Sequence, residues 1–192
     1  MLGPDYFSNP LIFLIKTLFG LYILAVLLRF LLQLSRADFY NPVSQFLVKI
    51  TQPPLRPLRR VIPGLAGIDM AALVLLLVLQ LLEIAVAGLL QRGGLPPLPP
   101  MLVLAVAELV ELTLNVYLVA IIVQAILSWV QPGYNPATAI LYSLTEPVLR
   151  PAQRILPPLG GLDLSPLVVI ILIQLLKMLL MPPLYGLARA VW

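Results

Sequence analysis

Hydrophobic residues along the chain gather in four long stretches, which are separated by two polar segments and one short proline-rich segment. The stretches run from about Pro10 to Leu34, Met70 to Leu90, Met101 to Val130, and Pro166 to Leu187. A helix needs about 20 mostly apolar residues to cross about 30 Å of hydrocarbon. The pattern therefore predicts an all-α membrane protein with four transmembrane helices.

Composition supports this prediction, because 61% of the residues are hydrophobic and only 10% are charged. A soluble fold could not cover so many apolar side chains. The start, Met1 to Pro10, lacks the basic segment and the small-residue cleavage pattern of a signal peptide, so we expect the first span to be retained.

The chain has no cysteine and no histidine. Disulfides and metal ligation by thiolate or imidazole are therefore excluded, as are the catalytic triads and dyads that need these residues. We expect no catalytic residue, no metal site and no cofactor. The net charge of +4 comes from basic residues that adjoin the hydrophobic spans. This position favours anionic lipid headgroups over nucleic acid as their partner.

Lysine and arginine are concentrated in the two long segments between spans, at residues 35–69 and 131–164. Because cytoplasmic loops carry the excess of Lys and Arg, both long loops should be cytoplasmic and both termini should face the other side. The connector Leu95 to Pro100, which holds four prolines, should join the second and third spans.

An internal repeat appears when the sequence is shifted by 94 positions. The match is gapless from Asn41-Pro42, which falls on Asn135-Pro136, through the loop into the next span, where Gln80 falls on Gln174. We therefore divide the chain into a first repeat, 1–94, and a second, 95–192. Each unit contributes two spans, so the units should be parallel, related by a pseudo-two-fold axis along the membrane normal.

Each loop is predicted to hold a short interfacial amphipathic helix. Asn followed by Pro is a helix start, and apolar residues then recur at helical spacing, at Val43, Phe46, Leu47 and Ile50 in the first unit. Pro53 and Pro147 should end these helices. A turn rich in Pro and Gly then leads to Asp69 or Asp163, where each can cap the next span.

The doubled pattern Asn-Pro, Thr-x-Pro-x-Leu-Arg-Pro-x-x-Arg-x-x-Pro and Gly-x-Asp resembles the YggT family, also called YlmG. The segments Arg36 to Pro42 and Gly160 to Pro166 resemble proteobacterial members, and Gly64 to Gly67 departs from the paired glycines of the second unit. Family members are inner-membrane or plastid-membrane proteins, so the resemblance implies a bacterial inner-membrane protein, whose termini would be periplasmic by the distribution of Lys and Arg. The resemblance links the family to osmotic tolerance, to cytochrome assembly and to envelope organisation, without a settled biochemical activity.

Two sets of loop residues are candidate sites. Guanidinium groups match phosphate oxygens, so the repeated arginines could bind lipid headgroups, although they could equally serve only to fix topology and extend toward the interface; they are Arg56, Arg60, Arg150 and Arg154. Asp69 and Asp163 are interpreted as helix caps or as partners of these arginines.

A third candidate lies within the spans, where Lys16, Glu83, Glu108 and Lys177 should form one layer of charge. Charged groups at this depth are costly unless they are paired or hydrated. We expect the two lysines to neutralise the two glutamates, with Glu111 as a substitute partner, and the alternative is a polar lining for ions or protons. Arg29, near the loop end, should extend to the interface.

Two function classes remain from the sequence. The first is a non-catalytic inner-membrane scaffold, or assembly and envelope-organising factor, that acts on lipids and other membrane proteins through its cytoplasmic loops. The second is a small ion transporter or channel component linked to osmotic tolerance. The sequence leaves open whether the protein forms a homo-oligomer.

Overall fold

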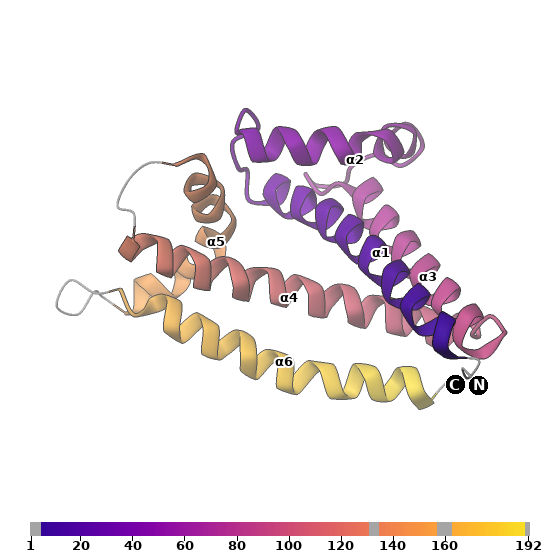
Figure 1. Ribbon diagram of the computed structural model, residues 1–192. Coiled ribbons are helices and arrows are strands. Elements are labelled where there is room, and N and C mark those ends of the chain that lie inside the picture. Colours follow the sequence, from indigo (N-terminus) through magenta and orange to yellow (C-terminus); the bar gives the residue numbers. More distant parts are fainter. Residues whose placement is uncertain (1–4, 131–134, 157–162, 191–192) are drawn as a thin grey trace.

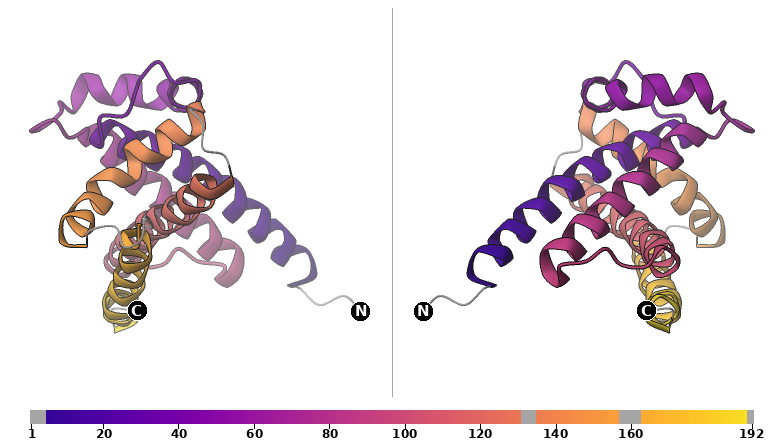
Figure 2. Two further views of the ribbon diagram at one scale, coloured as in Figure 1. Left: turned by 90° about the vertical axis from the view of Figure 1, so that its left-hand side faces the viewer. Right: turned by 90° about the vertical axis from the view of Figure 1, so that its right-hand side faces the viewer.

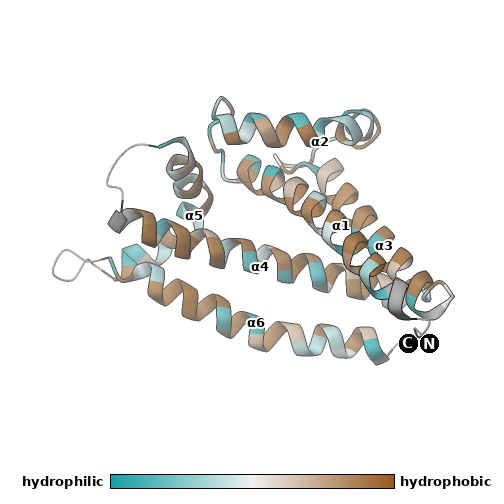
Figure 3. Ribbon diagram, in the orientation of Figure 1, coloured by the Kyte–Doolittle hydropathy of each residue, from teal (hydrophilic) through white to brown (hydrophobic). Residues whose placement is uncertain are grey.

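The computed structural model describes residues 5–130, 135–156 and 163–190 (Figure 1). Within these ranges it contains six α-helices, which are α1 (Asp5–Leu34), α2 (Pro42–Val61), α3 (Met70–Arg92), α4 (Leu98–Val130), α5 (Pro136–Ile155) and α6 (Ser165–Ala190). Helices α1, α3, α4 and α6 each contain a segment long and apolar enough to cross a membrane, as their colouring in Figure 3 also shows. The predictions of an all-helical protein and of four candidate spans are confirmed.

The four long helices form two pairs, α1 with α3 and α4 with α6 (Figure 1). The two pairs are inclined to each other, as the side views in Figure 2 show. One end of the molecule holds the start of α1, the end of α6 and the passage from α3 to α4, whereas α2 and α5 lie at the opposite end. Contacts of α3 with α4 and of α2 with α5 join the two pairs.

Buried apolar side chains form two clusters, one beside each loop helix. The larger cluster lies mainly where α1, α2 and α3 meet and includes Ile23, Val26, Leu55 and Ala71. The smaller one lies where α4, α5 and α6 meet and includes Ile121, Leu149 and Ile173. α2 therefore packs on α1 and α3, whereas α5 packs on α4 and α6 and also, through Ile140 and Leu144, on the larger cluster.

The starts of α2 and α5 follow the sequence prediction. Asn41 and Asn135 are the N-cap residues, and their side chains accept hydrogen bonds from the backbone N–H of Val43 (2.9 Å) and Ala137 (3.0 Å). In each helix a proline occupies the first turn, where its missing N–H removes no helical hydrogen bond. The Asn41 amide also donates to the carbonyl of Pro136 (2.7 Å), which links the two loop helices.

The prediction that Pro53 and Pro147 end the loop helices is wrong. Both helices continue past these prolines and are 20 residues long in total, with three interior prolines in α2 and two in α5. An interior proline leaves the carbonyl four residues earlier without its helical donor. For Pro54 that carbonyl is Ile50, which accepts a hydrogen bond from the Tyr22 hydroxyl of α1 (3.3 Å). Packing against α1 thus supplies a donor for one of the carbonyls that the prolines leave unsatisfied.

The connector between α3 and α4 is shorter than expected. α3 ends at Gly93, whose left-handed backbone (φ 69°) suits glycine and whose N–H donates to the Leu89 carbonyl. α4 begins at Leu98, three residues before the expected Met101, because its first turn needs no N–H from the prolines there. A Cβ at Gly88 would lie 2.7 Å from the Pro96 ring, so the connector packs tightly back on α3.

The turn before α3 departs from regular structure. Leu65 and Ile68 exchange backbone hydrogen bonds (3.1 and 2.8 Å), and Ala66 and Gly67 between them both have positive φ (51° and 83°). This is the geometry of a type I′ turn. The alanine costs about 1 to 2 kcal/mol in the left-handed region, which only the glycine adopts freely. The second turn, with Pro157 and the Gly160-Gly161 pair, lies outside the described residues.

Candidate functional site

The four candidate arginines, which are Arg56, Arg60, Arg150 and Arg154, all have exposed side chains on the loop helices. In α2 the arginines stand opposite the buried stripe of Leu47, Thr51 and Leu55. In α5 Arg150 pairs with Glu146 one turn earlier (2.9 Å), but both side chains are more than half exposed, so this pair adds little stability. These arginines are therefore available to groups outside the chain.

Exposed apolar side chains accompany the arginines on both helices. On α2, Phe46 is 60% and Val61 is 81% exposed. On α5, Tyr142 is 51% and Ile155 is 79% exposed. A helix that presents arginine together with apolar side chains outside its packed stripe has the composition of an interfacial helix.

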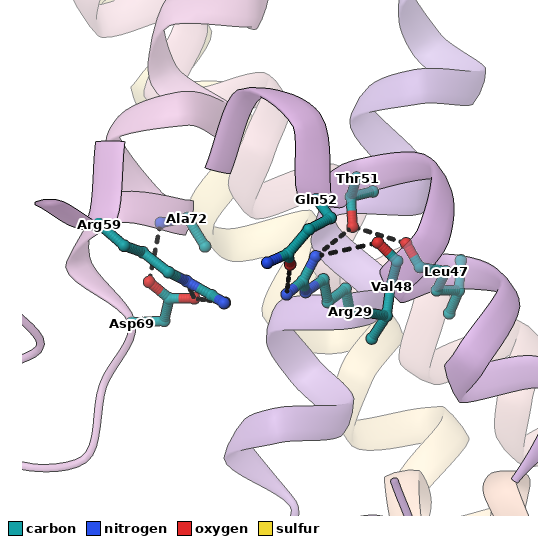
Figure 4. Close-up of polar contacts among 8 residues, drawn as sticks. All are labelled: Arg29, Leu47, Val48, Thr51, Gln52, Arg59, Asp69 and Ala72. Carbon is teal, nitrogen blue, oxygen red and sulfur yellow. Dashed lines mark hydrogen bonds and ion pairs between the residues drawn. The ribbon is translucent and has the colours of Figure 1, made fainter. Parts of the chain in front are cut away.

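Arg29 behaves differently from the sequence prediction. It does not extend to the interface: its side chain is 8% exposed and lies between α1 and α2 (Figure 4). Its guanidinium donates to the carbonyl of Val48 (3.3 Å), the Thr51 hydroxyl (2.8 Å) and the Gln52 side-chain oxygen (2.7 Å). α2 lies across the end of α1 (Figure 1), so Arg29 meets polar groups of α2 before it can reach water.

Asp69 caps α3 and also binds an arginine, but not one of the four candidates. Its carboxylate accepts from the Ala72 backbone N–H (3.2 Å) and forms an ion pair with Arg59 of α2, which donates through Nε (3.1 Å) and Nη2. The Asp69 side chain is 7% and that of Arg59 is 34% exposed (Figure 4). This pair ties the end of α2 to the start of α3.

Corresponding contacts occur in the second half with neutral partners. Asp163 accepts from Gln153 (3.0 Å), which lies 94 positions after Arg59, and from the backbone N–H (2.9 Å) and hydroxyl of Ser165. Partial burial acts to raise the pKa of Asp163, but the hydrogen bonds from Ser165 and Gln153 outweigh it and lower this pKa. Asp163 thus stabilises the start of α6 without an arginine.

Threonine anchors both loop helices to the first long helix of each half. Thr51 and Thr145 are fully buried, and each donates to the carbonyl four residues earlier, Leu47 (2.6 Å) and Leu141 (2.8 Å). Thr51 accepts from Arg29 of α1, whereas Thr145 contacts the side-chain amide of Gln124 of α4. The sequence prediction missed these contacts, although both threonines recur in the repeat.

Lys16, Glu83 and Glu108 lie near enough to act on one another electrostatically, but in the described residues Lys16 does not form the ion pair that we expected. Gln80, which is 5% exposed, donates to Glu83 (3.2 Å) and to Glu108 (2.6 Å), so an amide joins these glutamates across α3 and α4. Lys16 on α1 is exposed and has no carboxylate within 4.0 Å in the described ranges. Gln80 was visible in the repeat, but nothing in the sequence showed that it faces both carboxylates.

Lys177 pairs with Glu111 (3.5 Å), the substitute partner named from the sequence, and not with Glu83 or Glu108, which were expected first. Lys177 lies 13 residues before Ala190, the end of α6, and Glu111 lies 13 residues after Leu98, the start of α4. Equal depth in an antiparallel pair brings them together, about 20 Å from those ends. The prediction from sequence could not distinguish Glu108 from Glu111, because the two lie only one helical turn apart on the same helix.

Two further side chains complete this pair. Lys177 donates to the Asn115 side-chain oxygen (2.6 Å), and the Tyr185 hydroxyl donates to Glu111. Glu111 of α4 therefore contacts two side chains of α6, Lys177 and Tyr185. In the part of the chain that the structure describes, no three acidic side chains gather as metal ligands.

A family profile and several curated relatives match the sequence of this chain. The profile of the CCB3/YggT family matches residues 8–90 and 103–184. The chain belongs to the CCB3/YggT family. The YggT protein of Escherichia coli K12 is 39% identical over 173 residues, which cover 88% of each chain.

Two other relatives are more similar to this chain. An uncharacterized protein of Pseudomonas aeruginosa is 47% identical over 174 residues, which cover 90% of this chain and 88% of the relative. An uncharacterized protein of Vibrio alginolyticus is 43% identical over 173 residues, covering 90% and 94%. No solved structure matches the chain.

Proposed function

We propose that the protein is a non-catalytic scaffold of the bacterial inner membrane, which organises lipids and other membrane proteins through α2 and α5. One observation carries this proposal: both loop helices present exposed arginines beside exposed apolar side chains, at the same end of the molecule. Arginine favours anionic headgroups, and the apolar groups favour the acyl boundary. In this arrangement α2 and α5 lie in the cytoplasmic interface, and the termini face the periplasm.

A duplicated architecture supports the same proposal. α2 and α5 begin 94 residues apart and have equal length, and the family profile matches two segments of the chain. Two units, 1–94 and 95–192, related by a pseudo-two-fold axis along the membrane normal would present their loop helices to the same leaflet. Two equivalent surfaces suit a scaffold that engages two lipid clusters, two partners, or another copy in a homo-oligomer.

The test compares lipid preference in reconstituted protein. Spin-labelled phosphatidylglycerol should be enriched over spin-labelled phosphatidylcholine around the wild-type protein. The variant with Arg56, Arg60, Arg150 and Arg154 all replaced by Gln should lose most of that preference, because each basic residue near an anionic surface contributes about 1 kcal/mol. A matched control replaces the exposed Arg189, at the other end of the molecule. An unchanged preference in the fourfold variant would contradict the proposal.

A small ion transporter or channel component is the second candidate, and it would link the protein to osmotic tolerance. The group of Gln80, Glu83 and Glu108 favours it, because intramembrane carboxylates often mark ion or proton pathways. Purified protein in liposomes should then conduct protons or monovalent cations, and Glu108→Gln should reduce the flux at least tenfold. If the flux does not exceed that of protein-free liposomes, the transporter hypothesis is wrong and the scaffold remains the proposed function.

A further inference from the structure

A cavity of about 400 Å³ lies between the end of α1, the following loop and α2. Its polar lining consists of Arg29, Arg36, Arg59, Gln33 and Ser44. No carboxylate lines it in the described part of the chain. Arg59 is paired with Asp69, and in the described residues neither Arg29 nor Arg36 has a carboxylate within 4.0 Å, although Asp69 acts on Arg29 at longer range.

Arg29 is the first reason to expect an anion here. Its guanidinium is buried, and its recorded hydrogen-bond partners are neutral groups, namely a carbonyl, a hydroxyl and an amide oxygen. A buried charge is costly unless an opposite charge compensates for it. Guanidinium has five N–H donors, and only some of those of Arg29 are engaged, so others can bind an oxyanion.

Ser44 is the second and independent reason. It is 7% exposed, and its hydroxyl oxygen is the one buried side-chain polar atom without a hydrogen-bond partner in the described residues. An unpartnered buried hydroxyl costs about as much as a lost hydrogen bond unless a ligand satisfies it. Thr138, 94 positions later, instead donates to the Asn135 carbonyl (2.7 Å).

Arg36 adds a backbone argument. It lies just after α1 with a left-handed backbone (φ 54°), where the Ala37 N–H donates to the Leu32 carbonyl (2.9 Å). Glycine is the usual residue at this position of a helix end, and an arginine is strained there. Strain at a residue that lines a cavity is typical of a functional position.

We propose that this pocket binds a phosphate group, carried by a phospholipid headgroup or as a free phosphate ion. Arginine forks match the phosphate oxygens, and the Ser44 hydroxyl supplies a further donor. The site is distinct from the exposed arginines of the proposed scaffold and does not depend on that function. A shift of 94 positions places Val123, Val130 and Gln153 where the first half has Arg29, Arg36 and Arg59, and the side chain that contacts Thr145 is Gln124, so the second half lacks these three arginines.

A second cavity next to the first allows an experiment that distinguishes a phospholipid headgroup from a free phosphate ion. An apolar cleft of about 500 Å³ lies between α1, α2, α4 and α5, and Leu32 and Leu47 line both cavities. An acyl chain attached to a bound headgroup could occupy this cleft, whereas a free phosphate ion would not use it. Filling the cleft with Val119→Trp should therefore weaken phospholipid binding and leave phosphate binding unchanged.

The test uses the full-length protein in a neutral detergent. Isothermal titration with inorganic phosphate and native mass spectrometry with short-chain phosphatidylglycerol measure the two ligands. The main variants are Arg36→Gly and Ser44→Ala, because the first relieves a strained backbone and the second removes an unpartnered hydroxyl, so both should melt at or above the wild-type temperature. Arg36→Gly should weaken binding about tenfold or more, and Ser44→Ala severalfold.

Arg59→Gln and Arg60→Gln form a matched pair that removes one charge each. Arg59→Gln copies the Gln153 contact of the second half and should weaken binding, whereas exposed Arg60→Gln should not. Loss of phosphatidylglycerol alone in Val119→Trp assigns the headgroup, whereas wild-type protein that binds inorganic phosphate but not phosphatidylglycerol assigns the free ion. The proposal is overturned if neither probe binds, or if Arg36→Gly and Ser44→Ala bind both probes as the wild type does.

Discussion

The ion pair between Arg59 and Asp69 should contribute measurably to stability, and its two members should contribute unequally. Replacing Arg59 by Met would leave the Asp69 carboxylate, which is 7% exposed, with only the Ala72 backbone N–H as a donor. Replacing Asp69 by Asn would retain a good N-cap for α3, because Asn and Asp cap helices equally well. Arg59, which is 34% exposed, would then turn toward water.

The magnitude follows from burial. Breaking a fully buried pair costs about 3 to 5 kcal/mol, and the partial exposure of Arg59 reduces this by screening, so we expect about 2 kcal/mol for Arg59→Met. Arg59→Gln keeps one donor, as Gln153 does for Asp163, and should cost about 1 kcal/mol or less. Asp69→Asn should also cost about 1 kcal/mol or less, and the double variant Arg59→Met with Asp69→Asn should cost less than the sum.

Thermal unfolding in a mild detergent, followed by circular dichroism, measures these differences. For a chain of this length about 1 kcal/mol shifts the melting temperature by roughly 2 to 4 °C, so Arg59→Met should melt roughly 4 to 8 °C lower. Exposed Arg56→Met on the same helix serves as the control and should melt as the wild type does. Equal melting temperatures for Arg59→Met and Arg59→Gln would refute the reasoning, since burial of an unpaired carboxylate would then have no effect.

Three further outcomes are expected. Lys177→Met should lower the melting temperature in detergent, and Glu111→Gln, but not Glu108→Gln, should restore part of it, because only Glu111 loses its counter-ion. Arg29→Lys should destabilise the protein, since one ammonium group cannot replace contacts to three groups of α2, and a wild-type melting curve would argue against these contacts. Because its pKa is lowered, Asp163 stabilises the folded state above the ordinary Asp pKa of about 3.9, and this stabilisation is lost as the pH falls through the pKa of Asp163 in the folded state. Below about pH 5, acid should therefore destabilise the wild type more than Asp163→Asn. Equal pH profiles of stability for the two proteins would exclude this effect.

Membrane orientation is a separate prediction, which can be tested with single cysteines introduced at exposed positions. Ser44 is buried and unsuited to labelling, whereas Gln45 and Glu146 are exposed on α2 and α5. The chain has no cysteine, so single cysteines at these positions or at the exposed Asn9 are read without background. Impermeant thiol reagents should label intact cells at Asn9 only, and the opposite pattern would reverse the proposed topology.

The sequence predicted elements whose cause is local. Runs of apolar residues showed the four long helices, and Asn followed by Pro showed where α2 and α5 begin, because capping depends on neighbouring residues. The end of α2 was missed because it depends on distant contacts. Tyr22 supplies a donor to the carbonyl that Pro54 leaves unsatisfied, and no local pattern announces that contact.

Partners within the membrane were predictable by type but not by identity. Depth counts placed Lys177 within one turn of three glutamates, and only the packing of α4 against α6 selects Glu111. Arg29 was misjudged for a similar reason, since its distance from the end of α1 suggested access to water. The position of α2 across that end was needed to show that the guanidinium meets Thr51 and Gln52 first.

The two halves of the chain join the loop helix to the long helices at related places but with different chemistry. In the first half Arg29 contacts Thr51 and Arg59 binds Asp69; in the second, Gln124 contacts Thr145 and Gln153 binds Asp163. Amides suffice for these structural contacts, so the arginines of the first half are more than stability requires. Arg29 is buried and Arg59 is 34% exposed, and a buried cation that a neutral side chain could replace is expensive to retain. Their retention beside a cavity lined by Ser44 is explained if the first half binds an anion and the second does not.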